Sequence, residues 1–160
     1  ALRMLQRVFA ELDAAEDIDA NDPELSLLKG FMDLLLAVNL PFANPDQAIS
    51  RLQQGYPTYV SQRGIAIGMR DLERYPEALA AINRALEAAP NNPDLIYLKA
   101  QIYRLDGNNR ASLPLYNEAL TFASQLPDGV VEQMVFEQCL VEGNPGQVCA
   151  DRARSNRASR

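Results

Sequence analysis

The amino-acid sequence predicts an all-α fold in which one helix pair is repeated along the chain. Apolar residues recur at three- and four-residue spacing, and no segment alternates between apolar and polar residues as a half-buried strand does. In addition, NDPELSLLKGFMDLL (21–35) closely matches NNPDLIYLKAQIYRL (91–105), 70 positions further on. Because short connections make neighbouring helices antiparallel, we expect antiparallel pairs stacked into a solenoid.

Helix-breaking residues set the expected ends of the helices. Asp22 is expected to cap the second helix, with Pro23 as its first residue. Tyr75-Pro76 opens the fifth helix, and Pro90 closes it. The helices are predicted at residues 1–15, 23–38, 45–54, 59–72, 75–89, 93–106, 109–126, 129–142 and 145–156. Together they are expected to form a single helical-repeat domain over residues 1–160.

Two units carry a resemblance to the tetratricopeptide repeat family, whose unit is a helix pair of about 34 residues. In residues 59–92, small Ala66 stands where the first helix approaches its partner, and Ile82 and Ala85 continue the inward face. Residues 93–126 match through Ala100, Tyr103, Gly107, Tyr116 and Ala119, and depart from the pattern at Ser112 and Pro114. The resemblance implies a right-handed superhelical solenoid of about three to four repeats with atypical ends.

The flanking units fit the family pattern less well. Residues 23–56 match through Gly30 and Ala48 but need an insertion around LPFANP, and residues 129–154 match through the turn at 142–144. The first helix is expected to be the second helix of a preceding unit. Small residues are expected to let the helices approach closely, while large residues fill the gaps between them, among them Ile82, Tyr103 and Tyr116.

The composition argues against an enzyme and against cofactors. The chain has no His, which is the commonest general base and metal ligand, and two Cys without His cannot form a usual closed zinc set. The segment GIAIG (64–68) lies within a helix pattern and lacks a phosphate-binding signature. A net charge of −6 and a pI of about 4.7 argue against general nucleic-acid binding. No apolar run is long enough to span a membrane.

One acidic stretch resembles the start of a calcium-binding loop. Asp17, Asp19 and Asn21 alternate as EF-hand ligands do. However, Asp22 stands at the sixth place, which needs Gly, and Leu28 at the twelfth, which needs Glu. We therefore interpret this stretch as a turn between helices and predict no metal site.

The family resemblance implies a concave groove lined by the first helix of each unit. The residues expected to form a peptide-binding site there are Phe31, Arg63, Ile67, Arg70, Tyr97, Gln101 and Arg104. The arginines are suited to bind an acidic or C-terminal peptide segment, and the apolar residues to receive its side chains. The alternative is that these arginines are surface residues bonded to Asp71, Glu73 or Asp94.

Cys139 and Cys149 lie on either side of the turn EGNPG, so an antiparallel hairpin would bring their sulfur atoms together. A bridge between them would imply a periplasmic or other oxidising compartment. The alternative, two reduced buried thiols, fits a cytoplasmic location, which the sequence slightly favours. The Arg-rich end at 152–160 is interpreted as a solvated cap rather than a tail for an anionic partner.

The sequence as a whole favours a bacterial-type interaction module that binds a peptide or protein segment and acts as a scaffold or assembly factor. The alternative is a structural piece of a larger protein, which self-associates into a homo-oligomer through its atypical terminal units. A groove lined by arginines should lose affinity as salt rises, whereas an apolar stacking interface should not, so salt dependence separates the two.

Overall fold

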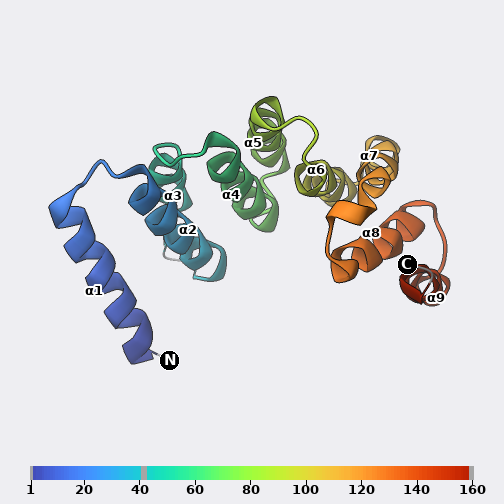
Figure 1. Ribbon diagram of the computed structural model, residues 1–160, viewed down its shortest axis with the longest axis horizontal. Helices are drawn as coiled ribbons and strands as arrows, with labels where there is room; N and C mark the ends of the chain where they lie inside the picture. The colour runs from blue at the N-terminus through green and yellow to red at the C-terminus, as the bar shows by residue number, and fades with distance from the viewer. Residues whose placement is uncertain (1, 41–42, 159–160) are drawn as a thin grey trace.

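The computed structural model describes residues 2–40 and 43–158, and within these residues every regular element is a helix (Figure 1). The predicted all-α solenoid of helix pairs is confirmed. The helices are α1 (Leu2–Ile18), α2 (Pro23–Asn39), α3 (Pro45–Leu52), α4 (Thr58–Asp71), α5 (Tyr75–Ala88), α6 (Pro93–Leu105), α7 (Asn109–Thr121), α8 (Asp128–Val141) and α9 (Gly146–Ala158), with a short 3₁₀ helix η1 (Ala123–Gln125) between α7 and α8.

The helices form a curved stack of pairs. α2 packs with α3, α4 with α5, α6 with α7 and α8 with α9, and each pair also contacts the next one. Figure 1 shows α3, α5 and α7 on the outer side of the arch and α2, α4, α6 and α8 along its inner side. α1 lies at one end and packs on α2, as the second helix of a unit packs on the unit that follows.

Most predicted helix ends agree with the structure. The Asp22 side chain accepts hydrogen bonds from the backbone N–H groups of Glu24 and Leu25, so the predicted cap is confirmed. The seventh helix is shorter than predicted: it ends at Thr121, the 3₁₀ helix η1 follows, and Leu126, which precedes a proline, is extended. Ala1, part of the LPFANP insertion and the last two residues of the Arg-rich end lie outside the described residues.

Small buried residues let the paired helices approach each other. Ala66, Ala78, Ala85 and Ala100 are fully buried, and Ile82 and Tyr116 fill the space between helices, as predicted. Ser112 is also fully buried. Burial of this polar side chain is tolerated because its hydroxyl donates a hydrogen bond to the Ala100 carbonyl at 2.9 Å. The prediction for Tyr103 is wrong: this residue lies in the last turn of α6 and is only half-buried.

One backbone position in three of the units adopts a left-handed conformation. It follows the first helix of each pair and is occupied by Glu73 (φ 59°), Gly107 (φ 79°) and Gly143 (φ 87°). Glycine adopts positive φ without steric cost, whereas a residue with a Cβ is strained there. Glu73 therefore carries strain that its two counterparts avoid.

We expect Glu73→Gly to stabilise the protein by about 0.5–1 kcal/mol, because it removes this strain. For a chain of this size the melting temperature should rise by about 1–4 °C. Thermal unfolding followed by circular dichroism measures the shift. Glu87→Gly, within α5 and exposed, is the control and should lower the melting temperature instead. A lower melting temperature for Glu73→Gly would contradict the prediction.

Candidate functional site

The inner face of α2 and α4 contains an apolar hollow of about 300 Å³. Two of the predicted groove residues, Phe31 and Ile67, line it, and Arg63 stands at its edge. Leu34, which the family pattern also places on the concave face, lines the hollow as well. Sequence reasoning did not place Leu35, Val38 or Asp71 in the groove. Of these, Leu35 is 65% exposed, which gives the hollow an accessible apolar rim.

Two glycines of α4 allow the side chains of α2 to pack closely on it. A Cβ atom at Gly64 would lie 2.2 Å from the Phe31 ring, and one at Gly68 would lie 2.3 Å from the Leu34 side chain. The segment GIAIG therefore has a packing role: its glycines allow two side chains of α2 to rest directly on the α4 backbone. The sequence signal was present, as two glycines four apart in a helix, but it does not reveal which side chains they receive.

Further along the inner face, the remaining predicted residues belong to a polar network around a buried carboxylate. Glu137 of α8 is 5% exposed. It accepts hydrogen bonds from Tyr116 at 2.7 Å, from Gln133 at 2.9 Å and from Gln101 at 3.1 Å. Arg104 lies 3.6 Å from the same carboxylate and forms an ion pair with it. Residues of α6, α7 and α8 thus converge on one buried charge.

Gln101 extends this network to α4. Its side-chain oxygen accepts from Arg70 at 2.9 Å, and its amide nitrogen donates to the Tyr97 hydroxyl at 2.8 Å. Burial, followed by the nearby charge of Glu137, raises the pKa of Tyr97 and of Tyr116. Both phenols therefore remain protonated over the physiological pH range and keep their hydrogen-bonding roles.

Each of the three predicted groove arginines has an acidic partner within the protein. Arg63 pairs with Asp94, and Arg70 pairs with the adjacent Asp71. Arg104 pairs with Glu137, which the sequence interpretation did not name as a partner. Asp71 and Asp94 had been proposed as partners in the alternative interpretation of these arginines. The positive charge available to an acidic ligand is reduced accordingly.

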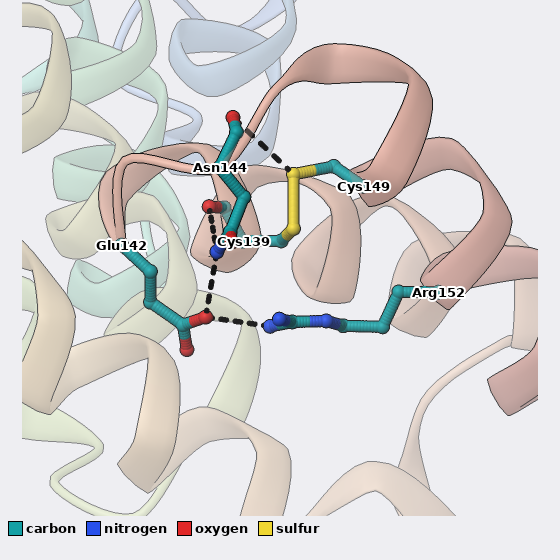
Figure 2. Close-up of a disulfide and its surroundings, with 5 residues drawn as sticks. All are labelled: Cys139, Glu142, Asn144, Cys149 and Arg152. Atoms are coloured by element: carbon teal, nitrogen blue, oxygen red, sulfur yellow. Dashed lines mark hydrogen bonds and ion pairs between the residues drawn. A yellow bond between two sulfur atoms is a disulfide. The ribbon is translucent and has the colours of Figure 1, made fainter.

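The two cysteines join α8 to α9. Cys139 and Cys149 form a disulfide with a Cα–Cα distance of 5.4 Å, shown in Figure 2 beside the turn that connects the helices. The Asn144 side chain donates to the Cys139 carbonyl at 3.2 Å, and Arg152 pairs with Glu142 at 2.6 Å. The bridge closes a loop of ten residues at the end of the stack.

The turn that resembles a calcium loop has a different use. Asp22 caps α2, and Asp19 accepts a hydrogen bond from the Asn21 backbone at 2.9 Å. Among the described residues, no group of three or more His, Cys, Asp or Glu side chains is placed to hold a metal ion. In the same residues, no helix is both long and apolar enough to cross a membrane.

Paired helices stacked in an arch, with the first helix of each pair inside, define a tetratricopeptide-like helical-repeat fold. The chain is similar in structure to PilW, described as a widely conserved type IV pilus biogenesis factor. The TM-score is 0.75 over 97% of this chain and 70% of that one, with 16% sequence identity, a level at which the similarity shows the fold. No protein-family profile matches the sequence, and neither does any curated protein.

We expect Glu137→Ala to destabilise the protein by about 3 kcal/mol, because three buried or half-buried side chains, Gln101, Arg104 and Tyr116, lose their acceptor. Urea unfolding measures the change. Glu132→Ala removes a surface ion pair with Arg157 from the same helix and should cost less than about 1 kcal/mol. Equal losses for the two variants would show that the buried network contributes no more than an exposed pair.

Reduction of the disulfide should lower the free energy of unfolding by about 2.5 kcal/mol, since the unfolded chain regains the entropy of an open loop. Thermal unfolding with and without a phosphine reductant tests this. A Cys139→Ser/Cys149→Ser variant should have the stability of the reduced protein and be insensitive to the reductant. An unchanged wild-type melting temperature on reduction would contradict the prediction.

Proposed function

We propose that this chain is a non-catalytic protein-interaction module that holds a segment of a partner protein along its inner face and acts as a scaffold or assembly factor. The apolar hollow between α2 and α4 carries the proposal. A hollow of about 300 Å³ with an exposed Leu35 is suited to receive one or two apolar side chains of a peptide. The PilW fold supports the assembly role, because the protein with that fold is described as a biogenesis factor.

The chemistry of the face favours a partner that leads with apolar side chains. Arg63 and Asp71, at the edge of the hollow, are both paired, so they present polar hydrogen-bonding groups with little net charge. A partner rich in acidic residues would have to displace Asp94 from Arg63 or Asp71 from Arg70. We therefore place the apolar hollow first in recognition and the arginines second, as groups that orient the partner's backbone.

The disulfide supports a proposal for the cellular compartment in which this module works. A bridge between Cys139 and Cys149 is stable where thiols are oxidised and is uncommon in a reducing cytosol. We accordingly propose that the protein works in the periplasm or a comparable oxidising compartment, instead of the cytoplasm that sequence analysis slightly favoured.

Affinity capture from the source organism tests the binding face. Wild-type protein should retain a partner that Leu35→Glu loses, because a carboxylate in the hollow would be buried on binding. Val148→Glu is the matched control: Val148 is 48% exposed on α9, away from the hollow, and its variant should keep the partner. Retention by all three proteins would argue against the hollow as the binding site.

Salt titration of the captured complex then separates the two kinds of recognition. Apolar burial predicts an affinity that does not fall as ionic strength rises, whereas recognition through Arg63, Arg70 and Arg104 predicts a steady loss. Isothermal calorimetry with the partner segment identified by capture gives this dependence. A steep loss of affinity with rising salt would show that the arginines, and not the apolar hollow, dominate recognition.

A further inference from the structure

The apolar hollow between α2 and α4 is lined by one stripe of residues from each helix. The lining of α2 runs from Phe31 to Val38 at offsets of three, four and seven positions, and the lining of α4 runs from Gly64 to Asp71 at the same offsets. Each stripe therefore spans two helical turns, or about 11 Å. A groove that two helices line in this way has the form that receives a third, amphipathic helix.

The backbone of a bound segment also favours a helix in this hollow. The backbone groups of α2 and α4 are hydrogen-bonded within their own helices, so they do not pair with an extended segment. An extended segment would place its N–H and C=O groups against Leu35, Val38 and Ile67, which offer no hydrogen bonds. A helix satisfies its backbone internally and can rest on these side chains without that cost.

Two ion pairs each turn one charged group toward the hollow. Arg63 and Asp71 line it, whereas their ion-pair partners Asp94 and Arg70 do not. Arg63 donates to Asp94 through Nε, and Asp71 accepts from Arg70 through Oδ1. The Nη groups of Arg63 and the Oδ2 atom of Asp71 form no hydrogen bond with the described residues. A single carboxylate can therefore share Arg63 with Asp94, although a run of acidic residues would have to displace it.

These two groups stand at opposite ends of the hollow. Arg63 and Asp71 are eight residues apart on α4, which separates them by about 12 Å along the helix axis. Both side chains are partly exposed, so each can be reached from the inner face. The hollow thus has a positive end and a negative end, with apolar side chains between them.

We propose that the segment held in this hollow is an amphipathic helix of a partner protein, with an acidic and a basic residue seven or eight positions apart. Two apolar side chains one turn apart would enter the hollow between these charges. The acidic residue would bind Arg63, and the basic residue would bind Asp71. This inference rests on the proposed function and specifies the chemistry of its partner.

The charge order also fixes the direction of the bound helix. A partner helix whose acidic residue comes first would lie parallel to α4, and one whose basic residue comes first would lie antiparallel to it. The two charges therefore set the orientation of the partner on the arch, while the apolar contacts supply most of the affinity.

Fluorescence anisotropy with four labelled, hydrocarbon-stapled helical peptides tests the proposal. All four carry the same two leucines, and the flanking pair is Glu/Lys, Glu/Gln, Gln/Lys or Gln/Gln. Each charge should tighten binding about threefold, so the Glu/Lys peptide should bind about tenfold more tightly than the Gln/Gln peptide. Leu35→Gln should weaken all four about tenfold, whereas Leu105→Gln, at an exposed leucine outside the hollow, should weaken none.

Charge variants show which group reads which residue. Arg63→Gln should remove the preference for Glu over Gln and keep the preference for Lys, and Asp71→Asn should do the reverse. A general loss of folding would weaken all four peptides alike and would not produce this pattern. Arg110→Gln, at an exposed arginine of α7, is the matched control and should keep both preferences.

Several outcomes would overturn the inference. Equal binding of the four peptides, still weakened by Leu35→Gln, would remove the charges from recognition and leave the hollow as the binding site of the proposed function. Equally tight binding of a Glu/Lys peptide with a central proline would show that the occupant is extended. Binding that Leu35→Gln leaves unchanged, or no binding by any helical peptide, would exclude a helix from the hollow. A dimer in sedimentation experiments that Leu35→Gln dissociates would assign the hollow to a second copy of the chain.

Discussion

Each helix pair of this protein has an apolar face that only the neighbouring pair can cover, and this constraint governs the rest of the structure. The core is therefore continuous through the stack, and Leu98 and Ile102 of α6 are buried because α4 and α5 lie beside them. Among the described residues, Leu28 of α2 has no such neighbour and is exposed.

The two halves of the inner face are stabilised in different ways. Between α2 and α4, two glycines bring the backbones close enough for Phe31 and Leu34 to rest on α4, which leaves an apolar hollow. Between α6 and α8, the side chains form a hydrogen-bonded network around Glu137. The apolar hollow therefore lies between α2 and α4, whereas the side chains around Glu137 bond mainly to one another.

The helix α9 differs from the other second helices in its composition. α9 is largely polar: Cys149 and Ala153 are buried, whereas Val148 remains exposed. Ala153 packs with Val131 and Val135 of α8, and the disulfide adds a covalent connection to this packing. α9 is thus tied to α8 by a covalent bond and presents polar residues on its outer face.

The sequence by itself determined the helices, their pairing and the repeat, because those depend on local periodicity, helix-breaking residues and small residues such as Ala66. It also placed Cys139 and Cys149 symmetrically about one turn. The tertiary structure decided which side chains meet across units. Glu137 neutralises Arg104, and Gly64 receives Phe31, through contacts between residues more than 30 positions apart. Periodicity places a residue on a face of its own helix, but the partner of that face depends on how successive pairs stack in space.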